Sequence, residues 1–192
     1  MGAELARLSY GDMKEIHAEM TRLEGSIPKA VGVSYIDHVA VAVERVRDLV
    51  PLYRDLLGGT FVDAGDDLLK NFRFVQFSYP GGFKIELIEP LSKDSFVRRF
   101  LDRRGPGMHH ILIQVKDIES AIEVAEQAGF RVVDKSLRPH GWNEAFLHPK
   151  STSGVLIEFG QYKRRPSDPQ GEWKFPYTLE EVLDGVLGGP KT

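Results

Sequence analysis

The sequence predicts an α+β fold in which two βαβββ modules form one curved mixed sheet. The main observation is a repeat of two strand-like segments, residues 37–43 and 109–115, each of which carries a histidine, His38 and His110. Each histidine is followed 48 residues later by a glutamate in a second apolar segment, and the two units lie 72 residues apart. A long repeat present in only two copies is typical of a duplicated module with pseudo-twofold symmetry.

Composition limits the classes of function. The 192 residues are 42% hydrophobic, enough for a sizeable core, and the net charge of −3 gives no basic excess for binding nucleic acid. The absence of cysteine excludes disulfide bonds and thiolate metal sites, so any metal must be held by histidine and carboxylate. No apolar run is long enough to span a membrane, and the N-terminal residues lack the apolar core of a signal peptide. We therefore expect a cytoplasmic protein that binds neither nucleic acid nor a membrane.

The first module is expected over residues 34–91, after a helical N-terminal extension at 1–33 that either packs on the domain or a partner subunit or covers the substrate. Its first strand has two different faces, because side chains alternate along a strand. One face carries valines that suit packing against a helix, and the other carries His38 followed by the small residues Ala40 and Ala42, which leave space. An amphipathic helix follows at 46–57, and three strands follow at 60–64, 72–79 and 83–89.

The same order of elements is expected again over residues 108–162. A linking helix lies within 92–107, and the second module then has a strand at 109–115 and a helix at 118–128. Strands near 130–136, 143–148 and 154–160 complete it. The tail, 163–192, is rich in proline and glycine before a short helix near 179–186, and we expect it to lie on the surface and to contact a partner or second subunit.

The repeat predicts a metal site in the cleft of the sheet. His38 and Glu86 come from one module, and His110 and Glu158 come from the other. Two imidazoles and two carboxylates suit one divalent transition metal, Co, Mn, Ni, Zn or Fe, with open coordination positions. The alternative is that these groups are structural, with Lys84 or His109 pairing with the carboxylates. An unpaired buried carboxylate is costly, and its occurrence twice at one spacing favours the four-ligand interpretation.

At these residues the sequence resembles the vicinal oxygen chelate superfamily, which includes glyoxalase I, extradiol dioxygenases and resistance proteins. Within it, the chain is most similar to methylmalonyl-CoA epimerases over about residues 34–161. The similarity lies in the segments IDHVAVA (36–42), KIELIEPL (84–91), GMHHI (107–111), FLHPK (146–150) and GVLIE (154–158). The resemblance implies the metal ligands His38, Glu86, His110 and Glu158, and a homodimer that acts on a small molecule such as an acyl-CoA.

The resemblance further implies abstraction of a proton α to a thioester carbonyl, with the metal stabilising the enolate. Epimerisation requires a proton carrier on each face of that intermediate. Glu158 is expected to be catalytic on one face. Some members of the family have a second glutamate on the third strand of the first module, where this chain has Gln76. Gln76 is then expected to bind substrate, and the second carrier is Glu144 or a water unless the reaction differs.

Several other residues are expected near the substrate. Lys150 and Ser151 lie in a turn that suits an anionic group. His109 is expected to point to the face opposite His110. Four arginines at 98, 99, 103 and 104 predict a solvated helix face, with attraction of CoA phosphates as the alternative. The competing functions are a glyoxalase I-like lyase acting on a thiol adduct and a non-catalytic binding protein of the resistance type.

Overall fold

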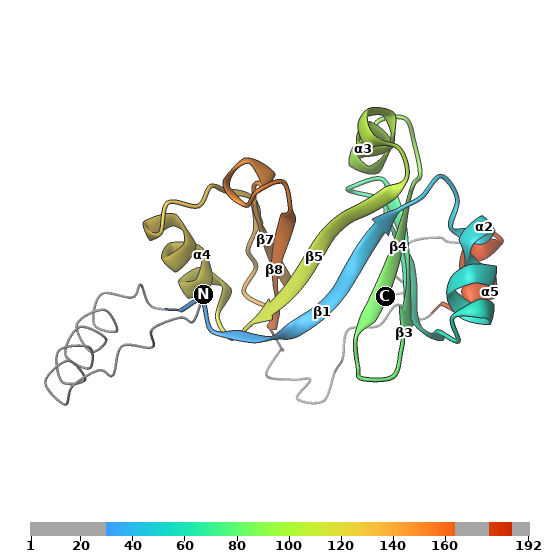
Figure 1. Cartoon of the computed structure of the whole chain (residues 1–192), viewed down its shortest axis with the longest axis horizontal. Helices are drawn as coiled ribbons and strands as arrows, with labels where there is room; N and C mark the ends of the chain where they lie inside the picture. Colours follow the sequence, from blue (N-terminus) through green and yellow to red (C-terminus); the bar gives the residue numbers. More distant parts are fainter. Residues whose placement is uncertain (1–29, 164–176, 186–192) are drawn as a thin grey trace, which may run out of the picture. The chain divides into compact units, whose positions relative to one another are not determined.

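The fold is a single curved eight-stranded sheet with helices packed against it, seen in a computed structural model that describes residues 30–163 and 177–185 (Figure 1). The strand order is β2-β3-β4-β1-β5-β8-β7-β6. The strands are β1 (Val33–Ala42), β2 (Thr60–Asp67), β3 (Phe72–Ser78), β4 (Lys84–Pro90), β5 (Gly107–Val115), β6 (Val132–Ser136), β7 (Gly141–Leu147) and β8 (Leu156–Lys163). The helices are α2 (Val46–Val50), α3 (Phe96–Arg104), α4 (Ile118–Gln127) and α5 (Leu179–Leu183), with a π-helix η1 (Pro51–Leu56) and a short 3₁₀ helix η2 (Pro149–Ser151).

The sheet repeats one arrangement of four strands twice. In the first half β1 is parallel to β4, and β4, β3 and β2 are joined by antiparallel pairing. In the second half β5 is parallel to β8, and β8, β7 and β6 are antiparallel in the same way. The two halves meet where β1 pairs with β5 in antiparallel fashion. The α+β fold predicted from the repeat is thus confirmed, as is the mixed character of the sheet.

The helix of the first module differs from the single α-helix expected over 46–57. It is α-helical only to Val50 and continues as the π-helix η1, in which the Leu57 N–H donates to the Leu52 carbonyl five residues earlier. Pro51 is the physical reason, because proline has no N–H to donate to the carbonyl four residues before it. One residue is thereby inserted into the helical turn, which is the usual form of a π-helix.

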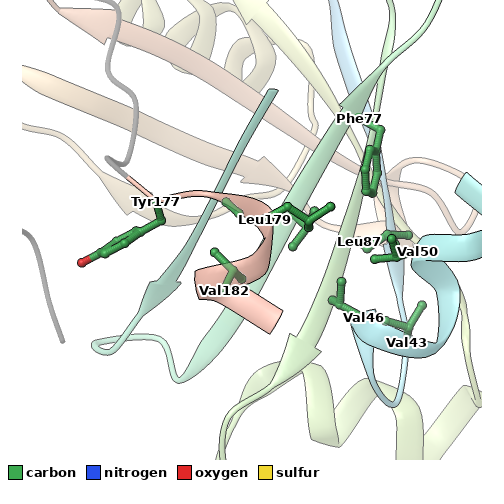
Figure 2. Close-up of a cluster of buried hydrophobic side chains, with 10 residues drawn as sticks. Val43, Val46, Val50, Phe77, Leu87, Tyr177, Leu179 and Val182 are labelled. Atoms are coloured by element: carbon green, nitrogen blue, oxygen red, sulfur yellow. The ribbon is translucent and has the colours of Figure 1, made fainter. Parts of the chain in front are cut away.

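The tail contributes to the core instead of lying on the surface. Tyr177, Leu179 and Val182 are buried in one cluster with side chains of α2, β3 and β4. Figure 2 shows Leu179 and Val182 of α5 beside Val46 and Leu87. A capping box between Thr178 and Glu181 begins this short helix. The expected surface position is therefore wrong for α5, because apolar side chains at every third position let even a helix of five residues bury one face.

Two further apolar clusters complete the core. One lies between α4 and the strands β5, β7 and β8, and the other lies under α3. The expected N-terminal helical extension and residues 164–176 and 186–192 of the tail lie outside the described residues. Among the helices that the structure does describe, none has the length and apolar character required to cross a membrane.

The packing of α5 predicts that Leu179→Ala lowers the free energy of unfolding by about 2–5 kcal/mol, because it removes a buried side chain and leaves a cavity. Urea denaturation followed by circular dichroism measures this change. Glu180→Ala is the matched control, since Glu180 is exposed on the same helix. Equal stability of the two variants would show that α5 does not contribute to the core.

Candidate metal centre

The four central strands bring the predicted ligands to one place. His38 lies on β1, Glu86 on β4, His110 on β5 and Glu158 on β8, and all four side chains are buried. In each module the glutamate is paired with the residue two positions after the histidine, Ala40 with Glu86 and Leu112 with Glu158. The equal spacing of 48 residues in the sequence therefore corresponds to an equal register in the sheet.

The ligand atoms of His38, Glu86 and His110 all lie within 4.8 Å of one another. Metal–ligand bonds of about 2.0–2.2 Å place opposite ligands about 4–4.4 Å apart, so only a small closure would bring these atoms to bonding distance. Glu158 lies beside this group, with an Oε2 3.1 Å from His110 Nε2. The structure thus brings three of the predicted ligands together and places the fourth in contact with one of them.

The two imidazole Nε2 atoms have no hydrogen-bond partner, although both are buried. His38 Nε2 is 3.5 Å from Glu86 Oε2 and His110 Nε2 is 3.1 Å from Glu158 Oε2, distances of ion pairs. Neither contact is a hydrogen bond, because a hydrogen bond depends on direction as well as distance. Buried polar atoms without a partner are rare and costly. Two such nitrogens beside two carboxylates fit a cation between them.

The residue before each histidine fixes the orientation of its ring. The Asp37 carboxylate accepts a hydrogen bond from His38 Nδ1 at 2.8 Å and also pairs with Lys84. His109 Nδ1 lies 2.9 Å from His110 Nδ1. Both contacts involve the far ring nitrogen, which leaves Nε2 directed at the cluster, the usual arrangement around a metal-bound histidine. Sequence reasoning did not identify Asp37, although its position directly before the first histidine was the available signal.

His109 does not point away from His110 as strand alternation predicted. The pairing of β1 with β5 is irregular at three positions, where Ser34, Asp37 and His109 are each an extra residue without a paired residue across the strands. Such a bulge changes the direction of the side chain. His109 consequently turns its ring toward His110 and packs against Phe96 and Phe100 of α3. The alternative pairing of Lys84 or His109 with the cluster carboxylates is absent from the described hydrogen bonds and ion pairs.

Gln76 supports the first-module glutamate. Its side-chain amide on β3 donates to Glu86 Oε1 at 2.8 Å, across the register that pairs the two residues. The other oxygen, Oε2, is the one near His38. Gln76 also lines the cavity, so its expected contact with substrate stays a prediction.

The charges of the cluster favour a bound cation. Burial by itself lowers the pKa of His38, but Glu86 and the hydrogen bond with Asp37 more than offset this and raise it to about 10. Burial raises the pKa of Glu86, whereas the adjacent His38 lowers it to about 2. Burial lowers the pKa of His109 to about 3, with the help of His110, so His109 is neutral. In the metal-free protein a proton on His38 therefore occupies the position in which a metal fits.

A cavity of about 1990 Å³ contains the cluster and extends over the inner face of the sheet. It is lined by His38, Glu86, His110 and Glu158, and also by Glu144 of β7. Glu144 is buried and is bound by Lys70, from the turn between β2 and β3, and by Trp142 Nε1 at 3.2 Å. Burial raises the pKa of Glu144, and the charge of Glu158 raises it further against the opposing effect of Lys70.

Lys150 and Ser151 are not among the residues that line this cavity. Ser151 is used within its own turn, where its hydroxyl donates to the His148 carbonyl and accepts from Arg131 N–H. The structure thus does not bring these two residues to the cluster. Lys70 and Trp142 contact Glu144 in the cavity instead, and Lys70 was not identified from sequence because its contact with Glu144 depends on the folded sheet.

Comparison with known proteins identifies the family. The sequence profile of the glyoxalase/bleomycin resistance protein/dioxygenase superfamily matches residues 37–146. This chain belongs to that superfamily. The match covers the first module and most of the second, including three of the four predicted ligands. The resemblance drawn from the repeated histidine and glutamate motifs is therefore confirmed.

Named relatives within the superfamily are epimerases. The chain is 34% identical over 129 residues to the mitochondrial methylmalonyl-CoA epimerase of Homo sapiens, covering 66% of this chain and 73% of that protein. It is 32% identical over 133 residues to the ethylmalonyl-CoA/methylmalonyl-CoA epimerase of Cereibacter sphaeroides, covering 67% and 98%. The crystal structure of methylmalonyl-CoA epimerase from Mycobacterium tuberculosis superposes with a TM-score of 0.64 at 30% identity, covering 72% and 93%. The racemase or epimerase class expected from the motifs agrees with these relatives.

Metal binding to this superfamily member should release a proton. His38 must lose its proton to bind a metal, and its pKa of about 10 means that it is protonated at neutral pH. Between pH 7 and 9 we expect release of about one proton per metal and an association constant that rises about tenfold per pH unit. Calorimetry of zinc binding in buffers of different ionisation enthalpy measures both.

The same proton affects the stability of the metal-free protein. Because the pKa of His38 is raised from 6.5 to about 10 on folding, its contribution is fully present below pH 6.5 and is lost as the pH rises through 10. For the metal-binding experiment, an association constant for zinc that does not change with pH would contradict protonation of His38.

Asp37→Asn should weaken metal binding about 10- to 100-fold, because the carboxylate that orients His38 and raises its basicity is removed. Competition with a chromophoric chelator gives the affinity. Asp55→Asn provides the control, since Asp55 is exposed and paired only with the adjacent Arg54 among the described contacts. A similar affinity in both variants would remove Asp37 from the metal centre.

Proposed function

We propose that this protein is a metal-dependent epimerase that removes and returns the proton α to the carbonyl of an acyl-CoA thioester. The observation that carries the proposal is the convergence of two unpartnered Nε2 atoms and two carboxylates in a cavity large enough for a substrate. The named relatives act on methylmalonyl-CoA, and a structural neighbour from Streptomyces coelicolor binds 2-nitronate-propionyl-CoA. The fold and site of this chain are consistent with the same substrate class.

The difficulty of this reaction is the negative charge that develops on the thioester oxygen when the α proton leaves. A divalent transition metal held by His38, Glu86, His110 and Glu158 would supply Lewis-acid stabilisation of that charge. Asp37, His109 and Gln76 hold three of the ligands in fixed orientations, so little rearrangement is needed when charge develops. All four side chains are buried, and charge interactions between buried groups are stronger than those in water.

Glu158 is assigned to proton transfer on one face of the planar intermediate. It lies at the side of the group formed by His38, Glu86 and His110, with one oxygen 3.1 Å from His110 Nε2. It also lines the cavity in which the substrate would bind. A carboxylate in this position can accept the α proton and return it.

Glu144 is assigned to proton transfer on the other face. The resemblance implies that Gln76 stands where some members of the family have a second glutamate, and an amide cannot carry the proton at neutral pH. Glu144 is the buried carboxyl that lines the cavity from β7, and its raised pKa brings it closer to the range in which a carboxyl exchanges protons. Glu144 can alternate between its protonated and ionised forms. In the ionised form, its contact with Lys70 prevents it from being an unpaired buried charge.

Deuterium exchange tests the proposed reaction. The metal-loaded protein, incubated with methylmalonyl-CoA in heavy water, should incorporate deuterium at the α carbon, as measured by mass spectrometry. Removal of the metal by a chelator should abolish exchange, and readdition should restore it. Absence of exchange with metal bound would overturn the epimerase proposal, and turnover of a thiol adduct under the same conditions would favour a lyase.

Separate substitution of the two carboxylates tests their assignment to opposite faces. We expect Glu158→Gln and Glu144→Gln each to slow inversion about 10²- to 10⁴-fold, because each removes one proton carrier. Each variant should still exchange the α proton of one epimer with solvent. The Glu158→Gln variant and the Glu144→Gln variant should act on opposite epimers. Chiral analysis of the products in heavy water, with the metal content of each variant determined, gives this result.

Glu119→Gln is the control, since Glu119 is exposed on α4. If Glu144→Gln inverts methylmalonyl-CoA at the rate of the unmodified protein, Glu144 is not a proton carrier.

A further inference from the structure

The cavity that contains the metal centre reaches a group of arginines on α3. Arg99, Arg103 and Arg104 line it, together with Phe96 and Phe100 of the same helix. Arg98 belongs to the same helix but is not among the lining residues. The solvated face that the sequence predicted for α3 is therefore divided, because one part of the arginine group faces the cavity.

The arginines of α3 also differ in their partners. Arg98 binds Glu44 through two nitrogens and binds Asp102 through its Nε. Arg99 donates to the Asp94 carbonyl at 2.7 Å. Neither Arg103 nor Arg104 has a hydrogen bond or ion pair with any residue in the part of the chain that the structure describes. Two exposed guanidinium groups, unpaired among residues 30–163 and 177–185, thus lie at the cavity, in a chain whose net charge is −3.

The position of these groups relative to the metal centre is fixed by β5. Two residues separate the end of α3 from the strand, which carries His109 and His110. The ring of His109 packs on Phe96 and Phe100 and contacts His110, so α3 is held against the cluster. The end of α3 that carries Arg103 and Arg104 therefore lies at the same cavity as the metal centre.

The wall near this end of the cavity contains exposed apolar side chains. Met108 is 49% exposed and Val155 is 36% exposed, and both line the cavity. A ligand that fills the cavity between the metal centre and α3 would therefore meet apolar as well as charged side chains. Such a ligand has a small polar group at one end, an uncharged arm in the middle and an anionic group at the far end.

We propose that Arg103 and Arg104 form a subsite for the phosphate groups of a CoA-type thioester. The inference rests on the proposed function, because the thioester end would then lie at the metal centre and the phosphates at α3. Arginine suits this role, since its guanidinium donates two parallel hydrogen bonds to phosphate oxygens and keeps its charge at all relevant pH values. The subsite would select CoA thioesters over thioesters of the same acyl group that lack phosphate.

Direct binding of free CoA tests the subsite without turnover. Titration calorimetry compares the full-length metal-loaded protein with the double variant Arg103→Ala/Arg104→Ala and with Arg98→Ala, the control on the same helix. We expect the double variant to lose about 10- to 100-fold in affinity, the effect of removing charge-assisted hydrogen bonds, and Arg98→Ala to bind as the unmodified protein. Equal affinity in all three proteins, with each variant folded by circular dichroism, would overturn the subsite.

Substrate discrimination gives a second readout. The ratio of kcat/KM for methylmalonyl-CoA to that for its N-acetylcysteamine analogue, which has no phosphate, should fall about 10- to 100-fold in the double variant. An unchanged ratio would contradict the proposal. Failure of the proposed function and failure of the subsite can be distinguished. Absence of deuterium exchange on either thioester would contradict the proposed function. Loss of CoA affinity in the double variant would still support a phosphate subsite.

Discussion

The antiparallel pairing of β1 with β5 is the interaction on which the rest of the structure depends. It joins the two modules into one sheet and sets the ring centroids of His38 and His110 5.5 Å apart. A shift of this pairing by one residue would turn one histidine to the opposite face of the sheet. The parallel partners β4 and β8 then add one glutamate each at the same register. The metal centre is thus a direct consequence of how two halves of the sheet meet.

The cluster is costly to bury, and its surroundings show how that cost is offset. Hydrogen bonds from outside the four-ligand cluster stabilise two of its buried groups. Asp37 binds His38, and Gln76 binds Glu86. Asp37 is in turn held by Lys84. The Nε2 atoms of His38 and His110 are still buried without a hydrogen-bond partner. The arrangement is therefore one in which a cation, either a proton or a metal, completes the charge balance of the site.

The proposed mechanism and the proposed phosphate subsite place different demands on one cavity. The chemistry needs buried carboxylates with fixed orientation, and these come from the sheet, where neighbouring strands hold them. Recognition of the distant anionic group needs exposed cations, and these come from α3, whose arginines reach the same cavity. His109 connects the two, because it contacts both His110 and the aromatic residues of α3.

The sequence by itself determined the duplication, the α+β fold and the convergence of His38, Glu86 and His110, because a repeated spacing becomes a repeated register. It did not determine the burial of α5, the turn of His109 toward His110 or the contact of Lys70 with Glu144. These features depend on strand bulges and on contacts between residues far apart in the chain. Local patterns cannot encode such contacts, since they arise only when the curved sheet brings its two halves together.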